Sequence, residues 1–248
     1  MYIGTNIQVL EKVDSTNAFL KNNTDIYQDG TIIIAKVQSH GRGRFERKWI
    51  SDIKGNLYCS ILTKDTAWLK NLTHLPIFMA VILRRAIITA AAQDAPSLCF
   101  KWPNDLASDG AKLAGILIES TKAGLVIGIG LNIKKAPKLA SNRTTTSMYE
   151  LFTLYKDLEP SDLVGFLVGC YNSGIKEYME KGFDVFKKEW EAHSCSLNKN
   201  VALNEGIDDN TVKQIVTFKG LNDDGGAIMV DASGKEKVIY YGELSDDV

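Results

Sequence analysis

Short runs rich in Ile, Val, Leu and Tyr recur along the first half of the chain, and they constrain its fold most strongly. Such residues, bounded by turn residues, favour strands, which are predicted at residues 31–38, 56–63, 98–102, 113–120 and 125–132. Helices are predicted at residues 15–21, 73–93, 161–181 and 183–192. Because neighbouring strands often follow one another directly, the pattern favours an α+β fold, a mixed sheet packed with helices, over a doubly wound sheet.

The pattern changes near residue 197. Further short strands are expected at residues 201–203, 211–221, 226–231 and 235–244, separated by turns rich in Asp, Asn, Gly and Ser. Closely spaced strands over about 50 residues indicate a small β-barrel. We therefore divide the chain into a larger domain, residues 1–196, and a small barrel, residues 197–248. From Val201 onward ten acidic residues face four basic ones, so we expect neither polyanion binding nor catalytic work there.

The sequence predicts neither a membrane span nor a signal peptide, and it marks the starts of two helices. The most apolar stretch, residues 75–92, is interrupted by Arg84 and Arg85, which predicts a buried core helix and no membrane span. No segment has the basic, apolar and small-residue order of a signal peptide. Ser15 or Thr16 is expected to cap the first helix, and Ser161, which follows Pro160, is expected to cap the third.

The cysteines and histidines indicate neither a disulfide framework nor a metal site. No C-x-x-C pair occurs, and most of the four cysteines lie in apolar contexts: Cys59, Cys99, Cys170 and Cys195. Free buried thiols in a reducing cytoplasm are therefore predicted. The three histidines have no metal-ligand spacing, so no structural metal is expected.

The segment from Gln38 to Trp49, QSHGRGRFERKW, concentrates positive charge. Residues 36–54 hold six Lys or Arg against two Asp or Glu, in a chain whose formal net charge is -1. Glycines beside arginines let the backbone approach an anion while guanidinium groups bind its oxygens. This predicts a phosphate-bearing ligand, with Trp49 available to stack on a base. The alternatives are a solvated loop or a generic nucleic-acid contact, and the near-zero net charge disfavours broad nucleic-acid binding.

Two further motifs accompany this loop: Ser15-Thr16-Asn17 near the start, and residues 101–105, KWPND, followed by residues 112–119, KLAGILIE. Together, in this order, these motifs resemble those of biotin protein ligases over residues 13–132. The resemblance implies a catalytic domain like that of class II aminoacyl-tRNA synthetases, followed by an SH3-like barrel. Since the first motif begins fourteen residues into the chain, we expect the ligase-only type without an N-terminal DNA-binding domain.

The implied reaction joins biotin to a lysine of a carrier domain in a biotin-dependent carboxylase. ATP activates biotin as biotinyl-5′-AMP, a cytoplasmic reaction in which ATP and Mg²⁺ are co-substrates and no prosthetic group is held. Such a site must bring two anions together and shield the adenylate from water. DNA and membrane partners are not expected, and the enzyme is expected to be a monomer or weak homodimer.

The resemblance assigns roles residue by residue. Catalytic roles are predicted for Lys112, Arg42, Arg44 and Asp105. Biotin contacts are predicted for Ser15, Thr16, Asn17, Gln38, Arg42, Gly43, Arg44, Lys112, Gly115 and Ile116. Nucleotide contacts are predicted for Trp49, Asn104 and Asn132. Asp105 is expected either to guide the acceptor lysine or to assist a metal, and the loop of Arg42 and Arg44 is expected to close over the adenylate.

Two other functions fit parts of this pattern. A lipoate ligase or octanoyl transferase of the same fold also uses an essential lysine, but Gly-Arg-Gly-Arg-Phe together with KWPND fits biotin ligases better. A non-catalytic biotin- or nucleotide-binding module would not need Lys112, Arg42 and Asp105 together. Neither a Walker A nor a Rossmann glycine motif occurs in the sequence.

Overall fold

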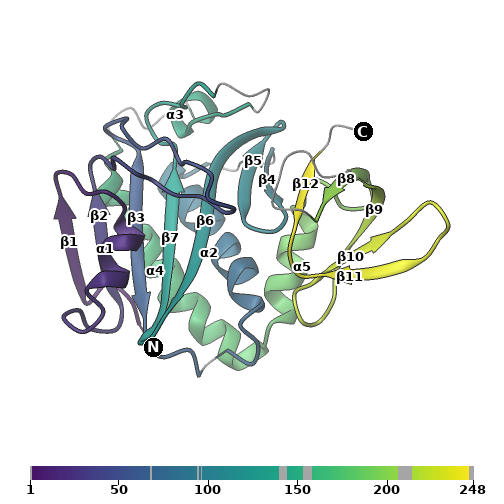
Figure 1. Ribbon diagram of the computed structural model, residues 1–248, viewed down its shortest axis with the longest axis horizontal. Helices are drawn as coiled ribbons and strands as arrows, with labels where there is room; N and C mark the ends of the chain where they lie inside the picture. The colour runs from purple at the N-terminus through teal and green to yellow at the C-terminus, as the bar shows by residue number, and fades with distance from the viewer. Residues whose placement is uncertain are drawn as a thin grey trace.

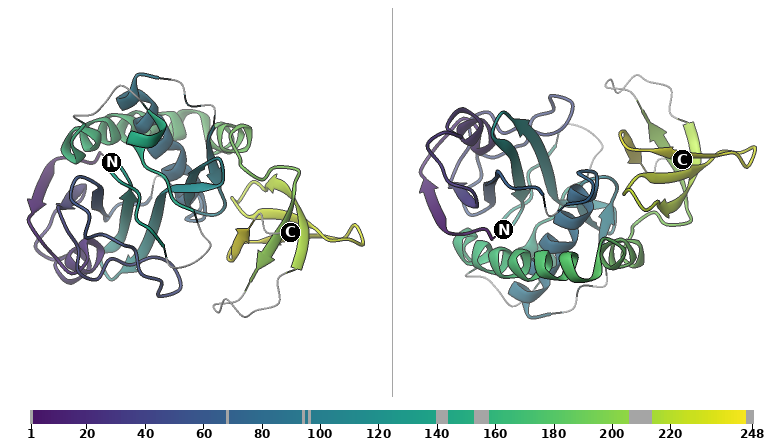
Figure 2. Two further views of the ribbon diagram at one scale, coloured as in Figure 1. Left: turned by 90° about the horizontal axis from the view of Figure 1, so that it is seen from above. Right: turned by 90° about the horizontal axis from the view of Figure 1, so that it is seen from below.

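The protein is built on two sheets, seen in a computed structural model (Figures 1 and 2) that describes residues 2–67, 69–93, 95, 97–139, 144–152, 158–205 and 214–245. The larger sheet has the order β1-β2-β3-β7-β6-β5-β4. Its strands are β1 (Asn6–Leu10), β2 (Thr31–Ala35), β3 (Leu57–Thr63), β4 (Leu98–Lys101), β5 (Asp105–Ser108), β6 (Ala111–Thr121) and β7 (Gly124–Leu131). Only the β1–β2 pair is parallel among these described strands, which confirms the predicted mixed sheet.

Helices cover mainly one face of this sheet. They are α1 (Thr16–Asn22), α2 (His74–Ala91), α3 (Met148–Leu151), α4 (Pro160–Lys181) and α5 (Asp184–Ala192). α2 packs against α4 and α5 behind the sheet, whereas α1 lies on the opposite face against β3 and β7 (Figure 1). Strands β2 and β3 are buried along their whole length, as their near-continuous apolar sequences require.

The apolar stretch near residue 80 forms the core helix that the sequence predicts. By length and composition α2 could cross a membrane, but 78% of it is buried inside the fold. Arg84, which interrupts the stretch, is itself buried and donates from Nε to the carbonyl oxygen of Leu98 at 3.0 Å. A buried cation is tolerated here because its hydrogen bond replaces part of its lost hydration.

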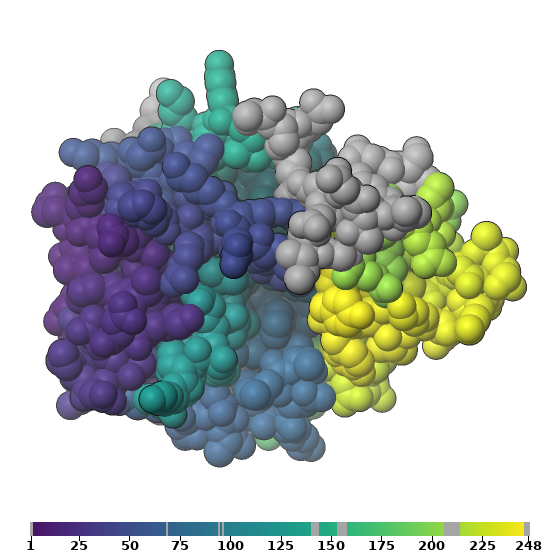
Figure 3. Space-filling model, viewed as in Figure 1, coloured from purple at the N-terminus to yellow at the C-terminus, as the bar shows by residue number. Residues whose placement is uncertain are grey.

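The C-terminal strands form a second, antiparallel sheet with the order β11-β10-β9-β8-β12. They are β8 (Asn200–Asn204), β9 (Gln214–Leu221), β10 (Ala227–Val230), β11 (Glu236–Ile239) and β12 (Glu243–Ser245). Within the described residues the outer strands β11 and β12 do not pair, so the predicted barrel is seen as an open sheet. It forms a separate lobe beside the larger sheet (Figures 2 and 3).

Polar contacts join the two lobes near the start of α2. His74 lies between the Tyr178 hydroxyl, 2.7 Å from its Nδ1, and the Asp223 carbonyl oxygen, 2.9 Å from its Nε2. Lys187 of α5 forms an ion pair with the Asp223 carboxylate at 2.6 Å. The second lobe is therefore held against the helices at the turn between β9 and β10.

The prediction of four free cysteines was wrong for one pair. Cys99 on β4 and Cys195, which follows α5, form a disulfide, while Cys59 and Cys170 are free. The neighbouring residues explain the proximity, because Phe100 and Ser194 pair as an isolated β-bridge. The two cysteines are 96 residues apart, and their sequence contexts do not indicate that β4 and the end of α5 meet.

Several element boundaries also differ from prediction. Glu159, and not Ser161, caps α4, with Pro160 in its first turn and Asp162 completing a capping box. Proline suits this position because its missing N–H would be unpaired in any case. The predicted strand 235–244 is interrupted and becomes β11 and β12, and residues 211–213 of another predicted strand lie outside the described residues. Strands β1 and β5 and helix α3 were not predicted.

Candidate functional site

A cavity of about 600 Å³ lies on the face of the larger sheet that carries α1. Every site residue predicted from the sequence lines it: Ser15, Thr16, Asn17, Gln38, Arg42, Gly43, Arg44, Trp49, Asn104, Asp105, Lys112, Gly115, Ile116 and Asn132. These residues come from α1, the basic segment, β5, β6 and the end of β7. The fold thus brings the separate sequence motifs to one place.

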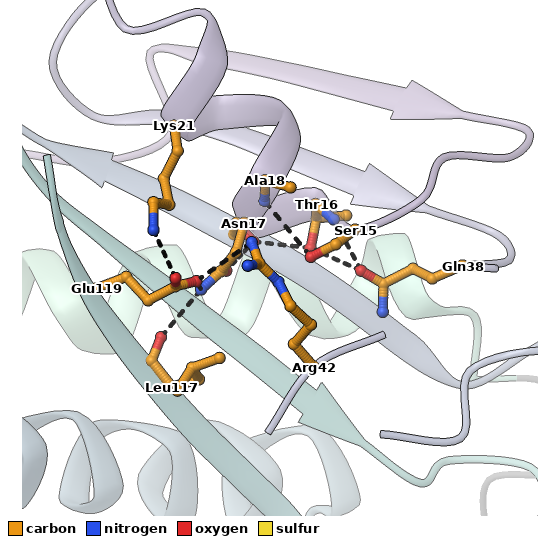
Figure 4. Close-up of polar contacts among 10 residues, drawn as sticks. Ser15, Thr16, Asn17, Ala18, Lys21, Gln38, Arg42, Leu117 and Glu119 are labelled. Atoms are coloured by element: carbon orange, nitrogen blue, oxygen red, sulfur yellow. Dashed lines mark hydrogen bonds and ion pairs between the residues drawn. The ribbon is translucent and has the colours of Figure 1, made fainter. Parts of the chain in front are cut away.

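One end of the cavity is formed by a polar cluster of Ser15, Thr16, Asn17, Gln38 and Ser60, all at most 8% exposed. Ser15 caps α1 by accepting from the Ala18 amide at 3.4 Å. Thr16 donates its amide and hydroxyl to Gln38 Oε1, at 2.7 and 3.1 Å. Ser15 is thus the cap of α1, one of the two caps predicted, and Ser15, Thr16 and Asn17 all line the cavity; Figure 4 shows their polar contacts.

Asn17 is held from several sides. Its Nδ2 donates to Glu119 Oε2 at 2.8 Å and to the Leu117 carbonyl oxygen at 3.3 Å (Figure 4). The Ser60 hydroxyl lies 2.5 Å from Asn17 Oδ1 and 2.7 Å from Thr16 Oγ1. A Cβ atom on Gly128 would lie 2.3 Å from Asn17 Oδ1, so Asn17 requires glycine in the strand beneath it.

The basic segment forms a short hairpin. Arg42 and Lys48 pair across it, the Gly43 amide donates to the Arg47 carbonyl at 2.7 Å, and the Trp49 amide donates to the Gly41 carbonyl at 2.9 Å. Phe45 and Glu46 form the turn with φ values of 54° and 58°. Such positive φ values are disfavoured for residues with a Cβ atom.

A cationic cluster of Arg42, Arg44, Arg47 and Lys112 also lines the cavity, and its Arg42 reaches Glu119 beside the polar cluster (Figure 4). Three of these cations form ion pairs with carboxylates: Arg42 with Glu119 at 3.7 Å, Arg47 with Glu243 at 2.5 Å, and Lys112 with Asp105 at 2.6 Å. Arg44 donates to the carbonyl oxygen of Gly242 at 3.0 Å. Burial lowers the pKa of Arg44, and the nearby carboxylates of Asp105 and Glu243 partly oppose this lowering. The guanidinium group nevertheless stays charged.

Lys112 is fixed through its backbone. Its amide donates to the Thr144 carbonyl at 2.9 Å, and its carbonyl accepts from the Thr146 amide at 3.0 Å. A Cβ atom on Gly115 would lie 3.2 Å from Lys112 Nζ and 3.2 Å from Asp105 Oδ1. The Lys112–Asp105 pair therefore occupies the space that glycine leaves open.

Four buried polar atoms on residues that line the cavity have no hydrogen-bond partner within the described part of the chain: Trp49 Nε1, Asp105 Oδ1, Asn132 Oδ1 and Ser245 Oγ. Trp49 lies flat on β7, where a Cβ atom on Gly130 would be 2.4 Å from its ring, and Lys112 Nζ is 5.3 Å from the ring centre. Asn132 donates from Nδ2 to the Thr146 carbonyl at 3.0 Å. Buried groups of this kind usually have a partner, so these atoms indicate where a ligand would bind.

Some residues at the site were not predicted. Ser60, a lone polar residue in the apolar run of β3, could have been identified from that contrast, and Glu119 ends a motif that was otherwise assigned. Cys59 also lines the cavity, but burial raises the pKa of its thiol to about 12, so it is no nucleophile at neutral pH.

The second lobe also reaches the cavity, although no catalytic work was expected from the last fifty residues. Asn204, Glu243 and Ser245 line it. Their position depends on how the two sheets meet, and sequence patterns do not give that arrangement. Among the described residues no group of three His, Cys, Asp or Glu side chains could hold a metal ion.

Comparison with known proteins places this chain in a family. Residues 9–134 match the biotin/lipoate A/B protein ligase family. The bifunctional ligase/repressor BirA of Escherichia coli is 29% identical over 98% of this chain and 74% of its own length. The biotin–[acetyl-CoA-carboxylase] ligase of Paracoccus denitrificans is 25% identical over 94% of this chain and all of its own length. The biotin protein ligase of Aquifex aeolicus, solved with biotin and ATP, is 30% identical, with a TM-score of 0.82 over 98% of each chain. From these matches, and from the one cavity that unites its motifs, the chain belongs to the biotin/lipoate A/B protein ligase family.

Proposed function

We propose that this protein is an ATP-dependent biotin ligase that forms biotinyl-5′-AMP and transfers biotin to a lysine of a biotin carboxyl carrier domain. The observation that carries this proposal is the single cavity that joins the buried polar cluster to the cationic cluster. The names of the similar proteins, biotin ligases solved with biotin and ATP among them, support the same activity.

The polar cluster suits the ureido ring of biotin. A ureido group has one carbonyl acceptor and two N–H donors, so it needs both donors and acceptors in a small space. Thr16 and Gln38 supply hydroxyl and amide groups, and Asn17 Oδ1 has a lone pair beyond the one that Ser60 occupies. The dithiolane ring of lipoate makes no such hydrogen bonds, which favours biotin over the lipoate alternative.

The cationic cluster suits the activation step. The biotin carboxylate attacks the α-phosphorus of ATP, a C–O–P bond forms, and pyrophosphate leaves. Both reactants are anions, so Arg42, Arg44 and Lys112 reduce their repulsion, and Lys112 stabilises charge on the α-phosphate as the bond forms. The Gly115 and Ile116 backbone would contact the bound acid at close range.

The nucleotide base is assigned to the end near Trp49. An adenine ring would stack on the indole, and the unpaired Asn132 Oδ1 would accept from its amino group. Asn104 lies beside the cationic cluster, with its Oδ1 3.4 Å from Arg44 Nη1. Mg²⁺ would enter with ATP, held largely by phosphate oxygens, since the described residues offer no carboxylate cage.

Transfer requires a second nucleophile. The carrier lysine amine attacks the acyl carbon of the adenylate, an amide forms, and AMP leaves with the bonding electron pair. Asp105, whose Oδ1 has no partner, is placed to accept a hydrogen bond from the incoming ammonium group and then its proton. This assignment uses Asp105 as guide for the acceptor and needs no metal.

The finer structural expectations complete the proposal. In this proposal residues 1–196 are the catalytic domain, and the open sheet described within residues 197–248 belongs to an SH3-like barrel, from which Glu243 reaches the basic hairpin. The enzyme is expected to act in the cytoplasm as a monomer or weak homodimer, without DNA or membrane partners.

Biotin-dependent ATP–pyrophosphate exchange tests the first step, and transfer of radiolabelled biotin to a purified carrier domain tests the second. We expect both with the wild-type protein. A parallel assay with lipoate should give little transfer. Preferred transfer of lipoate, or the absence of exchange at every Mg²⁺ concentration, would overturn the proposal.

A further inference from the structure

Glu119 on β6 lies immediately outside the cavity, behind the polar cluster. Its side chain is 19% exposed and accepts from Lys21 Nζ at 2.6 Å and from Asn17 Nδ2 at 2.8 Å. The Arg42 guanidinium is 3.7 Å away. One carboxylate thus connects helix α1, the basic hairpin and the sheet (Figure 4).

The ionised state of Glu119 determines how the Asn17 amide is oriented. Burial opposes ionisation, but the hydrogen bonds from Lys21 and Asn17 and the charge of Arg42 outweigh it, so the pKa of Glu119 lies below its ordinary value. An ionised carboxylate only accepts hydrogen bonds. It therefore selects the Asn17 orientation in which Nδ2 points toward Glu119 and Oδ1 remains with Ser60, on the opposite side of the amide.

We propose that Glu119 is a positioning residue that fixes the Asn17 amide so that its oxygen, and not its nitrogen, accepts the ring N–H of the substrate. This inference rests on the proposed biotin ligase function. The Leu117 carbonyl supports the same orientation only weakly, at 3.3 Å from Asn17 Nδ2. Without an acceptor-only group beside it, the Asn17 amide is free to rotate by 180°. Its Nδ2 donor would then face the ring N–H of the substrate, which is also a donor.

Lys21 and Arg42 complete this arrangement. Because two cations share the carboxylate, Arg42 retains part of its positive potential for an anionic ligand, while Lys21 balances the remaining charge from outside the cavity. Glu119 thereby links recognition of the ring to the placement of the hairpin that holds Arg42.

Glu119→Gln is the first test, because glutamine has the same shape but can donate as well as accept. Titration calorimetry should show biotin binding weakened about tenfold, the effect of one charge-assisted hydrogen bond. The KM for ATP should change by less than about twofold. In the Asn17→Ala background, Glu119→Gln should cause no further loss of biotin binding, since both act through the same amide.

Glu119→Asp is the second test. Aspartate is shorter but remains acceptor-only, so biotin binding should weaken less than in Glu119→Gln. A role in packing alone would give the reverse order, because Gln preserves the size of Glu and Asp does not. That reverse order, or additive losses in the double variant, would overturn the inference.

Glu177→Gln is the matched control. Glu177 is 23% exposed and bonds to Arg85 at 2.7 Å, away from the cavity, so this variant loses a comparable ion pair. It should bind biotin like the wild type, and equal losses in Glu177→Gln and Glu119→Gln would assign the effect to general destabilisation. Failure of the wild type to biotinylate a carrier domain would refute the proposed function. An active wild type with undiminished binding in Glu119→Gln would refute only the role of Glu119.

Discussion

The polar cluster and the cationic cluster, which meet where Arg42 approaches Glu119, are built on different physical principles. The polar cluster is buried and its hydrogen bonds are made within the protein before a ligand arrives. The cationic cluster is more open, with side chains 30–42% exposed for Arg42, Arg47 and Lys112, and its charges are paired with carboxylates of the protein.

This difference separates recognition from activation. A neutral ring is recognised by fixed donors and acceptors, whose preorganisation reduces the entropy lost on binding. The anionic groups of the substrates must instead replace Glu119, Glu243 or Asp105 as partners of the cations. Because each new ion pair forms at the expense of an existing one, the net gain in binding free energy is smaller. Changes at the two ends should therefore have separable effects on biotin and on ATP.

Lys112→Ala should have the largest effect. Loss of a fixed cation at the reacting phosphate should lower ATP–pyrophosphate exchange by about 10³-fold, with little change in the thermal midpoint because Lys112 is held through its backbone. Lys122→Ala, at the exposed turn between β6 and β7, is the control and should leave exchange unchanged. Equal exchange rates for wild type and Lys112→Ala would show that the lysine is misassigned.

Gly128→Ala and Gly130→Ala should affect the two substrates differently. The added methyl group meets Asn17 in the first variant and Trp49 in the second, and each such overlap should weaken binding about 30-fold. Calorimetry should show loss of biotin binding for Gly128→Ala and a raised KM for ATP for Gly130→Ala. Gly169→Ala in α4, where a Cβ atom meets nothing, is the matched control. Loss of both substrates in both variants would abolish the distinction.

Ser60→Ala should weaken biotin binding by about tenfold, because it removes the hydroxyl that donates to Asn17 Oδ1 inside the buried cluster. The Ser60 hydroxyl belongs to the polar cluster and bonds to Thr16 and Asn17, which are not predicted nucleotide contacts, so the KM for ATP should be unchanged. Steady-state kinetics with each substrate varied separately would measure both constants. A rise in the KM for ATP of the same size would contradict the separation.

Ionic strength should give the smallest effect. Raising the salt concentration from 0.05 to 0.5 M should raise the KM for ATP by about threefold, since salt screens the half-exposed cations. Binding of biotinamide, which keeps the ring but has no carboxylate, should be nearly insensitive to salt. Parallel titrations of ATP and biotinamide at each salt concentration would measure both effects. An equal salt dependence for the two ligands would contradict the difference between the polar and cationic clusters.

The sequence predicted the main sheet well, and the site residues that it predicts line one cavity, because both follow from local patterns. The continuous apolar runs of β2 and β3 identify buried strands, and the motifs of the basic hairpin and of residues 112–119 identify the family, which the comparisons confirm. The edge strand β1 was missed because Asn6 and Gln8 dilute its apolar residues. Strand β5 was missed because the KWPND motif indicates a turn, and the strand begins at Asp105, the last residue of that motif.

Features that depend on long-range packing could not be predicted. The Cys99–Cys195 disulfide and the approach of Glu243 to Arg47 join residues far apart in the chain, and no local pattern marks either pair. The role proposed for Glu119 likewise emerges only when Asn17, Lys21 and Arg42 are seen around it (Figure 4).

The turn of the basic hairpin carries a conformational cost that the rest of the hairpin must offset. Phe45 and Glu46 adopt positive φ values that cost roughly 1–2 kcal/mol each for residues of this kind. The backbone hydrogen bonds from Gly43 to Arg47 and from Trp49 to Gly41 are placed to offset that cost. Glycine at either turn position should therefore make the hairpin more stable, although no side chain of the cavity would change.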